Sequence, residues 1–342
     1  MSVYPYFDEN TQAKLQDYLR EKNFIAPLEE ISSLAKAGDG NMNATLKVVV
    51  SSGKSLVVKQ SRPFVKKFPE LDAPEDRILA EAAFYSLIQE RHPQKESMPK
   101  LQALDEANRL AIIDFEEEAK DGSFLYAFGN DDSLAITADL EKSLITIAEW
   151  LAELHTINVD DQLQNTRLQN LEMAEFQRNQ TLEVPFQKLM FQMKATLVPD
   201  TLYVEAWNAF RTSGFLAARN SLDTRFRRST KTLLHGDFFP KNWLFLPNGK
   251  IKIIDPEFCF FGPAEYDLGV MIAHLHLAGI PPESIARIFT AYTTKNPAAD
   301  GLLTDSFARF EIIRRIIGLA KLPIAENKAD ELLKNMVAFF SQ

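Results

Sequence analysis

Residues with β-branched side chains form two neighbouring runs near the N-terminus, and Ser51-Ser52-Gly53-Lys54 separates them. Such runs predict two strands joined by a hairpin loop. A segment with apolar residues at helical spacing follows, and two more short apolar runs come after it. The pattern also predicts a helix over residues 8–35. The expected strands are 45–50, 55–59, 101–104 and 110–113, and the expected main helix is 74–91.

The pattern changes after Phe115, where Glu116-Glu117-Glu118 begins a polar connection. Beyond it apolar residues recur mostly at helical spacing, with a few short strands. The predicted fold class is therefore α+β and two-lobed: a small antiparallel-sheet lobe with one main helix, residues 1–115, and a larger, mainly helical lobe, residues 116–342. The second lobe is expected to contain helices 139–157, 171–178, 183–196, 201–220, 265–278, 283–293, 304–320 and 328–340, and strands 232–234, 243–245 and 251–254.

Composition narrows the class of protein. Of the 342 residues, 46% are hydrophobic and 25% are charged, which is ordinary for a globular protein. The net charge of −9 argues against nucleic acid as a partner. No apolar run approaches the roughly 18 residues of a membrane span, and the N-terminal residues lack a signal-peptide pattern. With Cys259 as the single cysteine, we expect a cytoplasmic protein without a membrane or nucleic-acid partner; its oligomeric state stays open.

Polar residues follow two of the short strands in the second lobe. His235-Gly236-Asp237 comes after the first strand, and Asp255-Pro256-Glu257 comes after the last. Asp237 is able to accept a proton from a hydroxyl group. Asn242, Asp255 and Glu257 offer the oxygen ligands that Mg²⁺ prefers. Because magnesium is usually held by one or two carboxylates together with phosphates, this set suits a nucleotide.

Two other interpretations of these residues are open. The segments could be strand ends with capped turns and surface acids, without a chemical role. Alternatively, His235 and Asp237 could belong to a metal hydrolase site. A hydrolase would require further histidines, and no other histidine has metal-ligand spacing to His235.

The sequence His235-Gly-Asp-x-x-x-x-Asn242, followed by Ile254-Asp-Pro-Glu257, resembles the signature of the aminoglycoside and choline kinases, which share a protein-kinase-like fold. Four stretches resemble the 5-methylthioribose kinases within that family. Those kinases have His-Gly-Asp-Leu-His-Thr-Gly-Ser in the catalytic loop, whereas here Phe238-Phe-Pro-Lys-Asn242 follows the Asp. The four stretches are 38–43, 58–60, 255–263 and 313–320, so the likeness covers nearly the whole chain.

The resemblance implies an ATP site in the first lobe. Lys59, at the end of a predicted strand, would pair with the α- and β-phosphates, and Glu81 of the main helix would hold the lysine. Without the resemblance, both would be interpreted as a strand lysine and a helix glutamate with other partners. The glycine-containing loop would cover the phosphates, and the connection between the lobes would bind adenine through its backbone. The glycine-containing loop supplies Gly38, Gly40 and Asn41, and the connection between the lobes supplies Asp114 and Glu116.

For the second lobe, the resemblance implies Asp237 as the catalytic residue and Asn242 and Asp255 as metal ligands, either alone or together with Glu257. It also implies structural support from two residues. Asp267 would brace the backbone of the catalytic loop, although it is equally suited to cap the helix that follows. His235 would support the same loop.

Arg314 and Arg315 lie among isoleucines in a predicted helix. Two arginines in such a place require acids or an anion as partners. One interpretation is an internal ion pair with core acids. The other, implied by the resemblance, is a pair of arginines that line the sugar site.

These observations predict an ATP- and Mg²⁺-dependent phosphotransferase that phosphorylates a hydroxyl of a small molecule, with a sugar such as 5-methylthioribose as the expected acceptor. An aminoglycoside or other small-molecule kinase of the same family is an alternative. Arginines in the acceptor site would repel cationic aminoglycosides and favour a neutral or anionic acceptor. A nucleotide-binding pseudokinase is a further alternative, but the set of Lys59, Asp237, Asn242 and Asp255 is intact.

Overall fold

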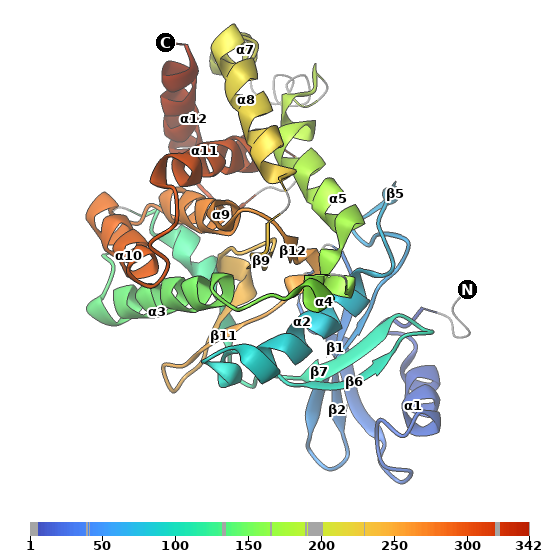
Figure 1. Ribbon diagram of the computed structural model, residues 1–342. Helices are drawn as coiled ribbons and strands as arrows, with labels where there is room; N and C mark the ends of the chain where they lie inside the picture. The colour runs from blue at the N-terminus through green and yellow to red at the C-terminus, as the bar shows by residue number, and fades with distance from the viewer. Residues whose placement is uncertain are drawn as a thin grey trace.

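The computed structural model describes residues 6–38, 40, 42–131, 135–164, 166–188, 190, 201–228, 230–318 and 322–341. Its first part is built on a five-stranded sheet, and its second part is mainly helical (Figure 1). The predicted two-lobed α+β architecture is confirmed, while the division at residue 115 stays a prediction. Among the described residues, none of the helices combines the length and apolar character that crossing a bilayer would require.

The large sheet is antiparallel throughout and has the strand order β1-β2-β3-β7-β6. The strands β2 and β3 form the predicted hairpin, and β3 is the central strand. The side chains of β2 alternate between buried and half-buried positions, because one of its faces packs against a helix. The strands are β1 (Ile31–Lys36), β2 (Ala44–Val50), β3 (Ser55–Gln60), β6 (Leu101–Asp105) and β7 (Leu110–Asp114).

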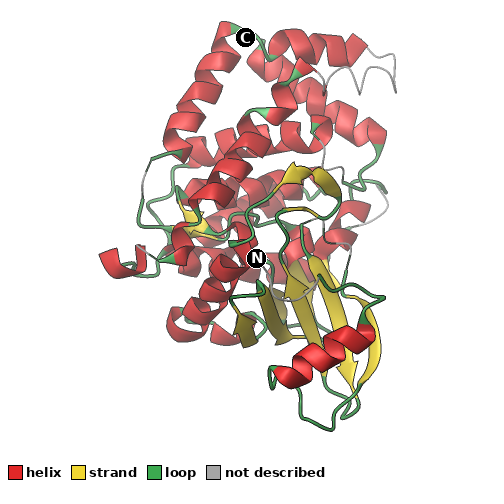
Figure 2. Cartoon of the chain, turned by 90° about the vertical axis from the view of Figure 1, so that its right-hand side faces the viewer, coloured by secondary structure: helices red, strands yellow, loops and turns green. Residues whose placement is uncertain are grey.

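Two helices cover the two faces of this sheet. Helix α1 (Gln12–Glu21) buries Leu15, Tyr18 and Leu19 against one face, and Figure 2 shows it lying across the strands. Helix α2 (Arg77–Arg91) packs on the opposite face, where its apolar side chains meet β3 and β7. The sheet is thereby buried on both sides, so the residues at the inner end of β3 are shielded from solvent.

The prediction of a helix over residues 8–35 is wrong in its second half. The helix ends at Glu21, because Asn23 adopts a left-handed conformation with φ of 58° and Pro27 follows. Residues 31–36 instead form β1, which pairs with β2 at the edge of the sheet. Only Ile31 of this strand is fully buried, so the strand carries no apolar alternation that the sequence could reveal.

The helices of the second lobe follow the predicted pattern with two exceptions. The expected helix 201–220 is two helices, because Thr212 interrupts it and caps the second one through a bond from Phe215 N to its Oγ1 (3.2 Å). The expected helix 183–196 begins as a short 3₁₀ turn, η4 (Val184–Phe186), and residues 191–196 lie outside the described residues. The helices are α3 (Ala138–His155), α4 (Asp161–Gln164), α5 (Leu171–Leu182), α7 (Thr201–Ala209), α8 (Ser213–Phe226), α9 (Ala264–Leu277), α10 (Pro282–Lys295), α11 (Gly301–Ile317) and α12 (Glu326–Phe340).

Three small sheets complete the fold. Strand β10 (Trp243–Phe245) lies between β11 (Ile251–Ile253) and β8 (Lys120–Asp121), and β9 (Leu233–Leu234) pairs with β12 (Phe260–Phe261). A third pair, β4 (Phe64–Val65) and β5 (Phe68–Asp72), forms a hairpin between β3 and α2. The sequence predicted β9, β10 and β11, but it missed β4, β5, β8 and β12; β4, β8 and β12 have two residues each, and β5 has no buried residue that would mark an apolar face.

Helices α9 and α11 pack closely because Gly269 has no side chain. A Cβ atom at Gly269 would lie 2.6 Å from Cβ of Phe307 and 2.9 Å from the carbonyl oxygen of Thr304, both on α11. These distances are shorter than any real packing contact. This glycine therefore sets the separation of the two helices that carry Asp267 and Arg315.

We predict that Gly269→Ala lowers the free energy of unfolding by about 1–3 kcal/mol, because the added methyl group must push α9 from α11. Urea denaturation followed by circular dichroism would measure the change. Gly214→Ala in α8 is the matched control, since an added Cβ there meets no atom within 4 Å. That variant should be unchanged or more stable by up to about 1 kcal/mol. Equal effects of the two variants would contradict the close-packing argument.

Candidate active site

Lys59 is the penultimate residue of β3 and lies opposite Ala111 of β7 in the antiparallel pair. Its Nζ lies 2.7 Å from Oε2 of Glu81 on α2 and also donates a hydrogen bond to Oδ1 of Asp255. The predicted pairing of Lys59 with Glu81 is present, and both side chains are buried. Burial alone would lower the pKa of Lys59, but the charges of Asp255 and Glu81 raise it well above its ordinary value. The lysine is therefore an ammonium ion held between the two lobes.

The loop after β9 brings Asp237 and Asn242 together. Gly236 has a φ of 84°, and a side chain there would collide with the carbonyl group of Phe258, so only glycine permits this turn. The chain then folds back through the 3₁₀ turn η5 (Pro240–Asn242). As a result, Nδ2 of Asn242 donates to the backbone oxygen of Asp237 at 2.8 Å. The amide oxygen of Asn242 is then the atom left to face a ligand.

The backbone of this loop is held from behind by a buried carboxylate. Asp267, in the first turn of α9, accepts hydrogen bonds from the backbone N–H groups of His235 (2.6 Å) and Gly236 (2.9 Å). The imidazole of His235 donates through Nε2 to the backbone oxygen of Ile254 at 3.0 Å. His235 thus links the loop to the end of β11, and burial keeps its pKa below the ordinary value. Asp267 and His235 therefore lie where they can support the backbone of this loop.

Asp255 follows β11 in a left-handed conformation, with φ of 67°. This turn points its carboxylate at Lys59, and the side chain stays 35% exposed. A carboxylate that is open to solvent beside Lys59 and near the Asn242 loop is suited to a magnesium ion that keeps waters and phosphate oxygens as its other ligands. Within the described part of the chain, no group of three or more His, Cys, Asp or Glu side chains could hold a metal alone. The donor set therefore fits a metal that arrives with a nucleotide.

Glu257 lies in the 3₁₀ turn η6 (Pro256–Phe258) and is almost fully buried. Its Oε2 atom accepts hydrogen bonds from Nδ2 of Asn43 (2.7 Å) and Nε of Arg77 (3.2 Å). Sequence reasoning found Glu257 but missed both of its partners, which come from the segment before β2 and from the start of α2. Glu257 is thus, like Asp255, an expected metal ligand that residues of the first lobe also bind.

The remaining nucleotide-side residues lie further from this cluster of charges. Gly38 and Gly40 are exposed between β1 and β2, with no close neighbours, and Asn41 lies outside the described residues. Asp114 ends β7, and its side chain accepts a bond from Gln102 (2.7 Å). Glu116 follows β7 and forms an ion pair with Lys252 of β11 at 3.2 Å. Their proposed contacts with ATP stay predictions.

A cavity of about 120 Å³ lies beside Asp237 and between the lobes. One wall is charged and consists of Asp237, Arg314 and Arg315. The apolar part of the lining is one cluster, which consists mainly of Met42 with residues of the β4–β5 hairpin and their neighbours, namely Val65, Phe68, Leu71, Phe176 and Phe258. The hairpin that the sequence failed to predict therefore forms part of the surface that faces Asp237.

The interpretation of the twin arginines as an internal ion pair with a core acid is confirmed, and both arginines also line the cavity; their contact with a sugar stays a prediction. The buried carboxylate of Glu311 accepts from Nε of Arg315 (2.6 Å) and from Nη1 of Arg314 (3.0 Å). His274 of α9 lies 3.1 Å from the same carboxylate. Sequence reasoning missed Glu311, although its i, i+3 and i, i+4 spacing to the arginines is the spacing of helical ion pairs.

Asp237 and Arg315 approach each other without forming a full hydrogen bond. Oδ1 of Asp237 lies 3.5 Å from Nη2 of Arg315, and both atoms are buried with no hydrogen-bond partner among the described residues. Burial raises the pKa of Asp237 to about 6, although the charges of Arg315 and Arg314 oppose this increase. Both atoms are themselves shielded from solvent, but they belong to residues that line one cavity, and such atoms are costly to leave unpaired.

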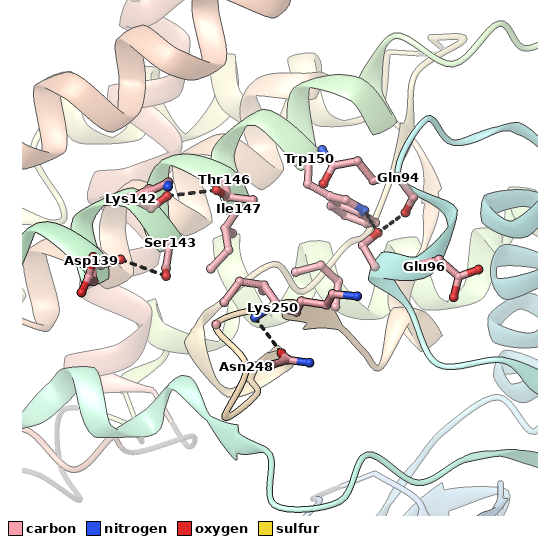
Figure 3. Close-up of a pocket in the computed structure, with 14 residues that line it drawn as sticks. Gln94, Glu96, Asp139, Lys142, Ser143, Thr146, Ile147, Trp150, Asn248 and Lys250 are labelled. Carbon is pink, nitrogen blue, oxygen red and sulfur yellow. Dashed lines mark hydrogen bonds between the residues drawn. The ribbon is translucent and has the colours of Figure 1, made fainter.

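A larger groove of about 650 Å³ lies elsewhere on the molecule, between α3, the 3₁₀ turn η1 (Lys95–Ser97) and the turn between β10 and β11 (Figure 3). Lys142, Lys250, Ile147 and Trp150 are among the residues that line it. None of the predicted site residues lines this groove. Asp237, Arg314 and Arg315, by contrast, line the smaller cavity.

Comparison with known proteins agrees with this geometry. The family described as "Phosphotransferase enzyme family" matches residues 36–302. A methylthioribose kinase of Pectobacterium atrosepticum is 26% identical over 82% of this chain and 68% of its own length. A methylthioribose kinase of Yersinia enterocolitica is 25% identical over 98% of this chain and 91% of its own length.

Solved structures show the same fold. A choline kinase from Cryptosporidium parvum superposes with a TM-score of 0.56, at 12% identity, over 96% of this chain and 94% of its own. Spectinomycin phosphotransferase superposes with a TM-score of 0.54, at 14% identity, over 96% of this chain and 97% of its own. At these identities the likeness concerns the fold alone, and it confirms the predicted protein-kinase-like class.

We predict that Glu311→Gln lowers the free energy of unfolding by about 3–5 kcal/mol, because it leaves Arg314 and Arg315 buried without their common anion. Urea denaturation would measure the loss. The matched control is Glu331→Gln on α12, where the carboxylate is exposed and pairs only with Lys328. That change should cost less than about 1 kcal/mol. A loss as small as the control's would show that Glu311 does not stabilise the arginines.

Proposed function

We propose that this chain, which belongs to the phosphotransferase enzyme family, phosphorylates a hydroxyl group of a small sugar such as 5-methylthioribose. The family and the methylthioribose kinase relatives make the chain an ATP-dependent small-molecule kinase. This excludes the metal hydrolase interpretation, and the intact cluster of Lys59, Asp237, Asn242 and Asp255 disfavours a pseudokinase. The chemical identity of the acceptor is the part of the function that we propose here.

The single observation that carries the proposal is the pair of unsatisfied atoms, Oδ1 of Asp237 and Nη2 of Arg315, beside one small cavity. An acceptor hydroxyl placed there can donate its hydrogen to Asp237 and accept one from Arg315. Two arginines next to Asp237 favour a neutral or anionic acceptor over a polycation. The small volume and the apolar wall of Met42, Phe68 and Leu71 favour a small molecule with an apolar arm over a multi-ring aminoglycoside.

On the nucleotide side, Lys59, held by Glu81, would bind the phosphates of ATP. Asn242 and Asp255 would hold Mg²⁺, with Glu257 as a further candidate. A bound Mg²⁺ would supply charge neutralisation for the phosphates. Gly38, Gly40 and Asn41 would cover the phosphates, and the backbone near Asp114 and Glu116 would bind adenine.

In the reaction, Asp237 would orient the acceptor hydroxyl and take its proton. The acceptor oxygen would form a bond to the γ-phosphorus while the bond between that phosphorus and the bridging oxygen of ADP breaks. Lys59 and Arg315 would stabilise the negative charge that is distributed over the phosphoryl oxygens. Positioning and charge stabilisation contribute most of the rate in this class of reaction, and the proton acceptor contributes a smaller factor.

We predict that 5-methylthioribose stimulates ADP release from Mg-ATP and that Asp237→Asn reduces this turnover by about 10²–10⁴-fold, because the amide cannot accept the proton. Nucleotide binding, measured by calorimetry, should be preserved. Asp305→Asn is the matched control: its carboxylate is exposed and pairs with Arg309 on the same helix. Loss of nucleotide binding in Asp237→Asn would contradict the role of Asp237. Nucleotide binding without sugar stimulation would exclude this acceptor, and a panel of aminoglycosides and amino alcohols would follow.

The raised pKa of Asp237 predicts an acid limb in the pH profile. The proton-accepting form exists above the pKa of about 6 and is lost as the pH falls through it, so kcat/KM for the acceptor should decrease about tenfold per pH unit below 6. Because Arg315 lowers the pKa of Asp237, Arg315→Gln should move the limb to higher pH. A limb that stays in place in Arg315→Gln would belong to the nucleotide or to another group.

A further inference from the structure

Arg77 is in a position where a cation is unfavourable. It is the first residue of α2 and is fully buried, and the N-terminal end of a helix carries partial positive charge. Asp76, which precedes it, does not cap the helix. Its carboxylate instead accepts a hydrogen bond from Nε of Arg109 at 2.6 Å. Arg77 therefore does not help α2 to form, and its presence requires another reason.

The guanidinium group of Arg77 joins three parts of the first lobe. Nη1 donates to the backbone oxygens of Arg62 (2.7 Å) and Pro74 (2.6 Å), and Nη2 donates to that of Met42 (3.2 Å). These carbonyl groups lie after β3, before α2 and before β2. A planar fork with five N–H donors can satisfy such a set, whereas the single ammonium of a lysine cannot.

The remaining donor of Arg77 reaches the second lobe. Nε lies 3.0 Å from Oδ1 of Asn43 and 3.2 Å from Oε2 of Glu257, and Nδ2 of Asn43 donates to the same Oε2 at 2.7 Å. The three side chains thus form a closed triangle of hydrogen bonds. Glu257 is two residues from Asp255, so the triangle connects the segment that precedes β2 with the expected metal ligands.

We propose that Arg77 is a positioning residue that, together with Asn43, fixes the carboxylate of Glu257 for the bound Mg-nucleotide. Both hydrogen bonds end on Oε2, which leaves Oε1 as the oxygen that can reach a cation. The inference rests on the proposed function, because it assigns Glu257 to the metal side of the nucleotide site. It extends that function by naming the residues that hold Glu257 in place, a contribution that outer partners of metal ligands commonly make.

The test compares the affinity for the non-hydrolysable β,γ-imido analogue of ATP with and without Mg²⁺, measured by calorimetry. The ratio of the two dissociation constants is the gain due to magnesium. Arg77→Lys keeps the charge but loses the fork, so this gain should fall roughly tenfold. Arg91→Lys, at the other end of α2, is the matched control and should leave the gain unchanged, since Arg91 is exposed and its side-chain hydrogen bonds to described residues go to Glu90 and Asn158.

A double-mutant cycle then decides whether Arg77 acts through Glu257. In a Glu257→Gln background, Arg77→Lys should cause no further loss of the magnesium gain. A further tenfold loss in that background, or an unchanged gain in the single variant, would overturn the proposal. If Arg77→Lys does not fold, Asn43→Ala replaces it, because it removes two sides of the triangle and leaves the ion pair of Arg77 with Glu257 in place. Absence of any magnesium gain in the native chain would instead reject the proposed function itself.

Discussion

The arrangement of the whole site depends on one buried cation, the ammonium of Lys59. It contacts the carboxylate of Glu81 within the first lobe and that of Asp255 in the second. Moving the lobes apart would break the contact with Asp255 and leave the buried ammonium with Glu81 alone. The separation of the lobes, and with it the width of the cleft, is therefore set by a contact between charges rather than by apolar packing alone.

On the acceptor side of the site, a buried charge again holds the neighbouring side chains in place, but here that charge is a carboxylate. One carboxylate, Glu311, binds two guanidinium groups, so the cluster keeps a net positive charge. That charge lies against Asp237, whose backbone is fixed from behind by Asp267 on α9. Since Gly269 lets α9 approach α11 closely, the packing of two helices determines how near the arginines come to Asp237. An ordinary packing requirement thus controls the electrostatics of the cavity.

Much of the fold and of the site could be predicted wherever a pattern of neighbouring residues in the sequence indicates it. The strands β2 and β3 and most long helices show their period, and the motifs around Asp237 and Asp255 lie directly after strands. Strand β1 could not be predicted, because an exposed edge strand has no apolar alternation. The partnership of Arg77 with Glu257 joins residues 180 positions apart, and no local pattern records it. Glu311 differs, since its helical spacing to the arginines was a signal available in the sequence.

Three ion pairs at the cleft each join a buried cation to a buried carboxylate: Lys59 with Glu81, Arg77 with Glu257, and Arg315 with Glu311. Buried ion pairs are weak contributors to stability, because apolar residues of the same volume often stabilise a fold as well or better. Their presence in the region where the two lobes meet is therefore better explained by geometry than by stability. Each pair holds a charged group in place before any ligand arrives, so no reorganisation is required when the phosphoryl group is transferred. The same reasoning explains why the cleft, and not the larger groove beside α3, carries the buried charges.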